Sequence, residues 1–319
     1  MNFVHDDPEF DELVRIVATK RGLSLALIEK DYWVTHALWA IHAQGFEVWF
    51  KGGTSLSKGF GLIQRFSEDL DLKLDPGSVD GMPVVENWHR MGATATQARR
   101  AYFEWLASSI VVPGADAQLD RERLDRHWRA AEIQIRYRGR HMADLGPDLM
   151  PFVLLEVGSA RVDPCVPCDL TSFVHEELEA QGQVGDYVDN LPKGVRCVHP
   201  LVTLLEKLDA LCRKAARADL EPSGYVRHYE DAARIAGATD LPPLTDYADV
   251  RALADEMDAQ GQLKSIPRAV DSAFHPGKLD HAKAIRRAYE RIEHMYWGGR
   301  ITLEEACSTL REWIAVSLS

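Results

Sequence analysis

The sequence predicts an α+β fold in which a mixed sheet is followed by a helical C-terminal domain. Up to about residue 197, short segments that alternate apolar and polar residues lie between longer segments with helical periodicity. From His199-Pro200 onward, only helical periodicity remains. We therefore predict an α/β domain with N-terminal helices over residues 1–197 and a helical domain over residues 198–319.

Composition limits the possible partners. The chain has 319 residues, 27% of them charged, and its net charge of -12 excludes binding to nucleic acid by bulk charge, so any such contact must be local. No apolar segment approaches the ~20 residues of a membrane-spanning helix, and the first residues lack a basic and apolar leader. We expect a cytoplasmic protein with no membrane partner.

The first half of the α/β domain is predicted as helix, helix, strand, glycine turn, helix and strand. Helical spacing, an aromatic run and a strict period of two distinguish these elements. They are two helices within residues 9–43 that break at residues 21–24, a strand at 46–50, a helix from Thr54 or Ser55 to about Ile63, and a strand at 69–74.

The rest of the chain is predicted from its periodicity and from Pro and Gly breaks. A loop at 76–92 precedes a helix near 94–110, a loop at 112–114 and strands at 132–138 and 152–157. The helices of the C-terminal domain are expected near residues 200–218, 223–237, 246–259, 278–297 and 302–317.

Two carboxylates on the strand DLDLKL indicate a metal site. Asp69 and Asp71 are two residues apart and therefore share a face, while Leu70 and Leu72 point inward. Mg²⁺ prefers oxygen ligands and usually lies between carboxylates and substrate phosphates. We predict that the two aspartates bind Mg²⁺ or Mn²⁺ and so take part in catalysis.

A glycine turn precedes this strand. Gly52 and Gly53 allow close approach of the backbone to a ligand, and the amides near Thr54 and Ser55 are suited to a nucleoside triphosphate. Taken singly, an Asp-x-Asp strand is typical of a solvated face and a Gly-Gly pair of a simple turn. Their combination in one strand-helix-strand unit is typical of the nucleotidyltransferase superfamily related to DNA polymerase beta.

Five short motifs indicate a particular family within this superfamily. The sequence resembles the AbiEii/AbiGii nucleotidyltransferase toxins of abortive-infection and toxin-antitoxin systems, including the MenT type. The matching motifs are EKDYWVT at 29–35, KGGTSL at 51–56, RFSEDLDL at 65–72, EKL at 206–208 and RHYED at 227–231.

The resemblance implies a polymerase-beta-like core and a helical domain that completes the active site. It also implies a divalent metal, an NTP substrate, transfer to an RNA acceptor such as the 3′ end of tRNA, and a cognate antitoxin protein. By position, it assigns phosphate binding to Gly53 and Ser55, metal binding to Asp69 and Asp71, and catalytic roles to Lys207 and Asp231.

For Lys207 the residues themselves add support, because Leu204, Leu208 and Leu211 would face a core while the lysine supplies a compact positive charge to the nucleotide. A plain surface lysine is the alternative. Asp231 could orient the base, position the lysine or activate the acceptor. No aspartate stands at the family's usual offset from Lys207, although Asp219 lies close.

A third metal-binding carboxylate is expected on a neighbouring strand. Glu156 interrupts the apolar run FVLLEV, and a buried acid needs a partner or a metal. Asp163 is an alternative, and Glu156 could also be an ordinary residue at a strand edge.

Seven arginines lie between residues 121 and 140, a basic segment in an acidic chain. Arg136 and Arg138 would share a strand face opposite Ile135 and Tyr137, with Arg140 as a possible third member. We predict RNA contacts there, against the alternative of a solvated or salt-bridged face.

The cysteines suggest no further site. Cys165 and Cys168 have the spacing of a zinc half-site, but no second pair of ligands follows at a standard spacing, and five cysteines do not indicate a disulfide framework.

These observations predict a metal-dependent nucleotidyltransferase that acts on RNA. Two alternatives stay open: an AMP transferase that modifies a protein hydroxyl, and a nucleotide-binding module without turnover. The intact acid pair argues against the second alternative, because two adjacent carboxylates repel each other unless they have a use.

Overall fold

The computed structural model describes residues 1–67, 69–145, 149–158, 161–217, 219–279 and 281–319, and the motif residue Glu68 lies outside them. Its contacts divide the chain into two compact units. The first unit comprises Met1–Gly59, Ser67–Val162 and Pro167–Cys197, and the second comprises Phe60–Phe66, Asp163–Val166 and Val198–Ser319.

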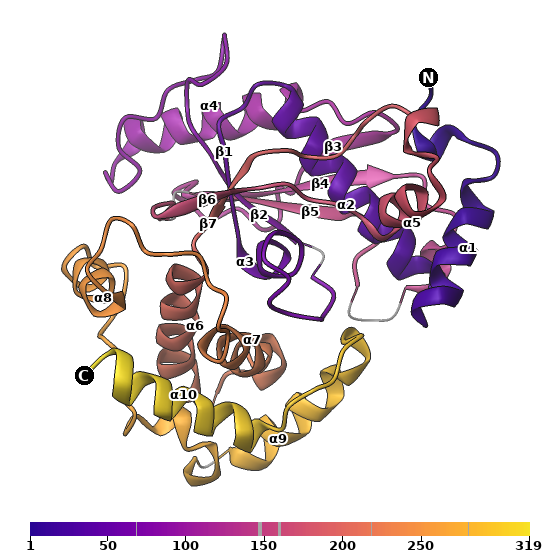
Figure 1. Ribbon diagram of the computed structural model, residues 1–319. Helices are drawn as coiled ribbons and strands as arrows, with labels where there is room; N and C mark the ends of the chain where they lie inside the picture. The colour runs from indigo at the N-terminus through magenta and orange to yellow at the C-terminus, as the bar shows by residue number, and fades with distance from the viewer. Residues whose placement is uncertain (68, 146–148, 159–160, 218, 280) are drawn as a thin grey trace. The chain divides into compact units, whose positions relative to one another are not determined.

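Within the described residues, seven strands form one sheet in the order β3-β4-β5-β2-β1-β7-β6 (Figure 1). β2 pairs with β5 and β1 with β7 in parallel, whereas the β1-β2, β3-β4 and β4-β5 pairs are antiparallel. The predicted mixed sheet is therefore confirmed. The strands are β1 (Val48–Lys51), β2 (Asp69–Leu74), β3 (Ala115–Leu119), β4 (Ala130–Tyr137), β5 (Val153–Gly158), β6 (Cys165–Cys168) and β7 (Val195–Val198).

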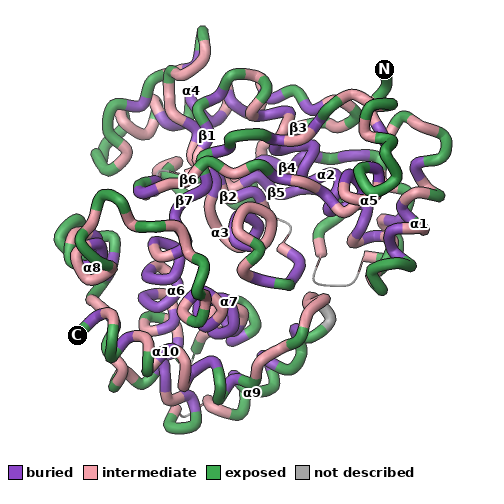
Figure 2. Tube along the Cα trace, in the orientation of Figure 1, coloured by how far each residue is buried: buried purple, intermediate pink, exposed green. Residues whose placement is uncertain are grey.

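Helix α2 is buried on almost every side (Figure 2). The Ser24 side chain caps its N-terminus, and α1 and α5 pack against it. Helix α4 lies along the sheet, where the Tyr102 hydroxyl donates to the carbonyl of Leu74 at 2.9 Å (Figure 1). The helices of the first unit are α1 (Phe10–Arg21), α2 (Leu25–Ala43), α3 (Gly52–Thr54), α4 (Ala93–Ser109) and α5 (Phe173–Gln181).

The second unit is helical, as predicted for this part of the chain. Helix α7 packs against α6 and α10, and a capping box of Thr302 and Glu305 begins α10. The helices are α6 (Pro200–Ala215), α7 (Arg227–Ala236), α8 (Val250–Ala259), α9 (Ala282–Arg291) and α10 (Leu303–Ser317).

Short 3₁₀ turns connect these elements in both units. They are Val4–Asp6, Met142–Asp144, Val184–Asp186, Pro222–Gly224, Ser272–Phe274, Pro276–Lys278 and Ile292–Met295. The last of them ends the long helix expected at residues 278–297, so that helix is shorter than predicted.

The helix predicted from Thr54 or Ser55 to about Ile63 is present with different bounds. It begins at Gly52 as the short α3, continues as a π-helix over Ser55–Gly59, and ends four residues before Ile63. Thr54 does not cap a helix, because its hydroxyl lies 3.0 Å from the carbonyl oxygen of Ser67 and 2.7 Å from that of Asp69. Periodicity also missed β3, α5, β6 and β7, two of which have only four residues.

Candidate active site

The acid pair lies on β2, at the centre of the sheet. Leu70, Leu72 and Leu74 are at most 1% exposed, whereas Asp69 and Asp71 are half-buried on the opposite face. The strict period of two in the sequence produces this division.

Asp71 belongs to a row of charged residues that crosses four strands. In the sheet register Asp71 faces Lys51 of β1 and Glu156 of β5, and Glu156 in turn faces Glu132 of β4. Directly paired residues point to the same side of a sheet. Asp71, Glu156 and Glu132 therefore stand side by side, and we call these three residues the carboxylate row.

A basic side chain stands at each end of the carboxylate row. Lys51 Nζ lies 4.0 Å from Asp71 Oδ2, and Arg123 Nη1 donates to Glu132 Oε2 at 3.1 Å. A pocket of about 240 Å³ adjoins the row. It is lined by Asp71, Arg123, Ala130, Ala131, Glu132, Glu156, Val157 and Gly158.

Sequence reasoning missed Lys51, Arg123 and Glu132 as members of this site. The alternation of Glu132 with buried Ile133 and Ile135 was a usable signal, but its pairing with Glu156 depends on the sheet register.

The glycine turn lies against the acid pair. Gly52 has a φ of +76°, and a Cβ atom built on it would be 3.1 Å from Asp71 Oδ2. A side chain there would both strain the backbone and press on the carboxylate. Gly53 follows within α3 and is half-buried.

Thr54 and Ser55 differ in what their hydroxyls do. Thr54 binds the carbonyls of Ser67 and Asp69, so it fixes the start of β2. Ser55 is 1% exposed, and its Oγ finds no partner within the described part of the chain. A buried hydroxyl without a partner is uncommon and is a position where a bound ligand can supply the missing hydrogen bond.

The donor set fits a divalent cation of the magnesium type. Asp69, Asp71 and Glu156 supply carboxylate oxygens on neighbouring strands. As the side chains stand, the described residues contain no group of three His, Cys, Asp or Glu placed to hold a metal ion. Mg²⁺ does not require such a group, because it commonly uses one or two carboxylates, substrate phosphates and water.

In the second unit, Asp231 is the centre of a buried charge cluster. It is 0% exposed, Arg65 binds both of its oxygens at 2.7 Å, and Lys207 Nζ donates to Oδ2 at 2.9 Å. Burial by itself would raise the pKa of Asp231. The positive charges of Arg65 and Lys207 outweigh burial and hold that pKa well below its usual range.

Lys207 is 8% exposed, and burial lowers its pKa although Asp231 opposes the shift. The ring of His228 lies 3.5 Å away, and burial together with Lys207 lowers the pKa of His228. Of the roles considered for Asp231, this geometry is that of a residue that positions the lysine. Asp219 is not part of the cluster, since it pairs with Arg217 on the surface.

The remaining sequence-predicted residues lie outside the acid site. Asp163, the alternative to Glu156, lies in no strand, and its segment belongs to the second unit. Arg136 and Arg138 are exposed at the end of β4, while Ile135 and Tyr137 are buried. In the described ranges the five cysteines form no disulfide, and no helix is long and apolar enough to cross a bilayer.

Comparisons with known proteins bear on the class of this site. The family model described as nucleotidyl transferase AbiEii toxin, type IV TA system, matches residues 37–306. No curated protein matches the sequence. Among solved structures, the crystal structure of JHP933 from Helicobacter pylori aligns with a TM-score of 0.43 and 13% identity, covering 92% of each chain.

Proposed function

The chain belongs to the AbiEii nucleotidyl transferase toxin family, and from this membership we propose that it transfers a nucleoside monophosphate from an NTP to an RNA acceptor. The 3′ end of tRNA is the acceptor that we propose. One arrangement carries the assignment of the site: Asp71 of β2 and Glu156 of β5 stand side by side, and β2 is preceded by the glycine turn and by Ser55, whose buried hydroxyl has no partner among the described residues.

The reaction is a displacement at the α-phosphorus. A hydroxyl oxygen of the acceptor forms a bond to this phosphorus while the bond to the β-phosphate bridging oxygen breaks, so pyrophosphate leaves and the hydroxyl proton passes to solvent. Asp69, Asp71 and Glu156 would hold Mg²⁺ or Mn²⁺. When bound, such ions neutralise the triphosphate and activate the attacking hydroxyl.

The chain's own groups have separate tasks in this proposal. The Ser55 hydroxyl and the amides of the turn bind phosphate oxygens, and the absence of a side chain at Gly52 leaves room for Asp71. Lys51 offsets part of the negative charge of Asp71 before a metal binds. For Lys207 the proposal rests on sequence resemblance: it contributes positive charge during catalysis, and Asp231 keeps it in place.

Family membership also implies a partner. The family is that of a type IV toxin-antitoxin system, so we propose that this chain acts as the toxin and that a cognate antitoxin protein counteracts it. Induced expression should slow growth, and Asp69→Asn should relieve the effect at equal protein level. Equal growth inhibition by wild type and Asp69→Asn would contradict a catalytic toxin.

The direct test is a transfer assay. The purified chain is incubated with Mg²⁺, each labelled NTP in turn, and total RNA together with protein substrates. We expect label on RNA with wild type, none after Asp71→Asn or metal chelation, and normal transfer by Asp80→Asn, which changes an exposed loop aspartate. Label on protein would favour the AMP transferase, and NTP binding without pyrophosphate release would favour the non-catalytic module.

A further inference from the structure

The motif at residues 29–35 of α2 contributes nothing to the carboxylate row, yet most of its side chains are buried. Glu29 is 3% exposed, and its two carboxylate oxygens accept the backbone N–H groups of Arg140 at 2.8 Å and His141 at 3.0 Å. One turn further along α2, Trp33 stacks on Tyr137 with ring centroids 4.8 Å apart. The motif thereby fixes the chain that follows β4.

A pocket of about 570 Å³ lies at this point in the first unit. Its charged side chains come mainly from the end of β4 and the residues after it. The lining residues are His5, Asp6, Trp33, Gly114, Ala115, Asp116, Arg136, Arg138 and Arg140. We call this cavity the arginine pocket.

The three arginines of this pocket outnumber its two carboxylates, Asp6 and Asp116, although Asp116 of β3 is paired with Arg136 in the sheet register. Arg136, Arg138 and Arg140 are exposed, and none of them forms an ion pair with a residue that the structure describes. Other arginines of the same basic segment are paired. Arg121 pairs with Glu104, Arg123 with Glu132 and Arg129 with Asp125.

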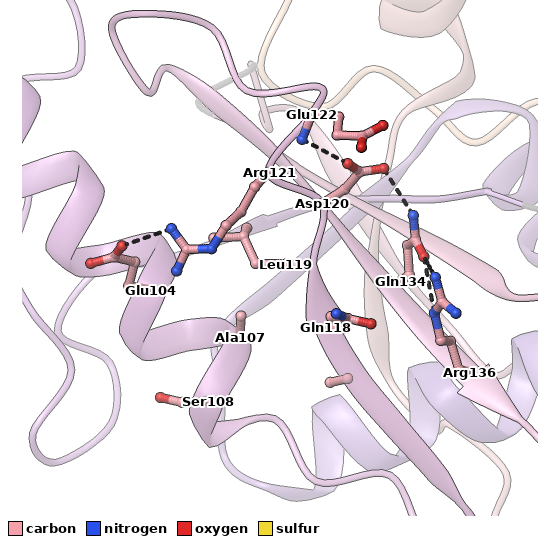
Figure 3. Close-up of a pocket in the computed structure, with 11 residues that line it drawn as sticks. Glu104, Ala107, Ser108, Gln118, Leu119, Asp120, Arg121, Glu122, Gln134 and Arg136 are labelled. Carbon is pink, nitrogen blue, oxygen red and sulfur yellow. Dashed lines mark hydrogen bonds and ion pairs between the residues drawn. The ribbon is translucent and has the colours of Figure 1, made fainter.

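In a neighbouring pocket of about 580 Å³, by contrast, an arginine is paired with a carboxylate (Figure 3). Two pairs of its polar side chains bind each other: Arg121 donates to Glu104, and Gln134 donates to Asp120 at 2.8 Å. Arg136 reaches this pocket too, where it donates to the neutral Gln134 and forms no ion pair with a residue that the structure describes. The arginine pocket is therefore the better candidate for binding an anion.

The walls of the arginine pocket are closely packed. Gly114 has a φ of +77°, and a Cβ atom there would come within 2.8 Å of His5 Nε2 and 3.0 Å of Trp33 Cη2. Trp33 is 3% exposed, and its indole N–H lacks an acceptor in the described ranges. A buried N–H without an acceptor costs free energy that a ligand atom can recover.

We propose that the arginine pocket binds the sugar-phosphate backbone of the RNA acceptor, an inference that rests on the proposed function. Guanidinium groups match phosphate oxygens with paired hydrogen bonds. The lining also includes Asp6 and Asp116, which can only accept hydrogen bonds when ionised. A ribose-phosphate chain offers both anionic oxygens and 2′-hydroxyl donors, whereas an acidic peptide would place further carboxylates against the two aspartates.

The test measures RNA binding without NTP or metal. A fluorescently labelled single-stranded RNA is titrated with wild type, with Arg138→Ala/Arg140→Ala, and with the control Arg121→Ala/Arg129→Ala. Both double variants remove two exposed positive charges from the same segment. We expect Arg138→Ala/Arg140→Ala to bind RNA about tenfold more weakly than wild type. Its slope of log K against log salt should be smaller in magnitude by about two, whereas the control should bind nearly as wild type.

Equal losses in the two double variants would show bulk attraction and would overturn the proposal, as would no loss in either. Single-stranded DNA of the same sequence should bind more weakly, and equal binding would contradict recognition of the ribose. Polyglutamate that binds more tightly than RNA would assign the pocket to an acidic peptide. Because no turnover is measured, failure of nucleotide transfer with intact RNA binding would reject the proposed function and leave this proposal standing.

Discussion

Arg65 binds Asp231 through two parallel hydrogen bonds, from Nε to Oδ1 and from Nη2 to Oδ2, each 2.7 Å long. The two residues are 166 positions apart and belong to different sequence motifs, RFSEDLDL and RHYED. Their contact ties segment 60–66 to helix α7 within the second unit. Asp231 therefore has a structural task that is separate from any catalytic one.

Asp231→Ala should lower the free energy of unfolding by about 3–5 kcal/mol, because Arg65 and Lys207 would stay buried without their shared partner. Urea denaturation measures this loss. The matched control is Asp219→Ala, which breaks an exposed pair with Arg217 and should leave stability unchanged. Similar effects of the two substitutions would show that the buried cluster contributes no special stability.

The same cluster predicts acid sensitivity. The folded pKa of Asp231 lies below the ordinary value of 3.8, so its contribution to stability is fully present above about pH 4 and is lost as the pH falls further. Thermal unfolding followed from pH 6 to pH 2 should show a decline for wild type that is smaller for Asp231→Asn. Parallel curves for the two proteins would contradict this assignment.

Neighbouring residues Thr54 and Ser55 should respond in opposite ways. Thr54→Val removes a hydroxyl that binds two carbonyls and should cost about 1–3 kcal/mol of stability. Ser55→Ala removes a hydroxyl without a described partner, so stability should hold while the KM for NTP rises. Steady-state kinetics and urea denaturation of both variants test these two expectations. A destabilised Ser55→Ala with normal KM would mean that the hydroxyl serves the fold.

Gly52→Ala should reduce kcat because its Cβ would press on the Asp71 carboxylate. Gly61→Ala is the control, since Gly61 also has a positive φ of +64° but nothing lies within 4 Å of its Cβ position. Both variants should suffer a backbone cost of about 1–2 kcal/mol. Only Gly52→Ala should lose activity at a temperature where both are folded, and equal activity would remove the Gly52-Asp71 contact from the mechanism.

Glu156 and Glu132 are adjacent in the carboxylate row, but only Glu156 directly faces Asp71. Glu156→Gln should lower kcat by about a hundredfold, as expected when a group that helps to hold the catalytic metal is lost, and weaken activation by Mg²⁺. Glu132→Gln releases Arg123 and should have a much smaller effect on the metal requirement. Metal titrations of both variants test this order, and a stronger effect of Glu132→Gln would move the metal site toward β4.

Much of the local architecture follows from local sequence. The alternation of Asp69 to Leu74 predicts which face of β2 is buried, and the helical spacing within residues 9–43 predicts the two helices α1 and α2. These features depend on residues within one or two turns of chain, for which periodicity is sufficient. Family motifs then indicated the acid pair, the glycine turn and the second-unit lysine.

Only the tertiary structure decided which distant groups meet. Glu132 joins Glu156 through strand register, Arg65 joins Asp231 across 166 positions, and Glu29 fixes the backbone of Arg140. It also decided which arginines of the basic segment are paired and which line an open pocket. Periodicity shows which side of an element faces the core. Which distant residue packs against that side is decided by strand register and by the path of the chain between elements. Both depend on the packing of the whole unit.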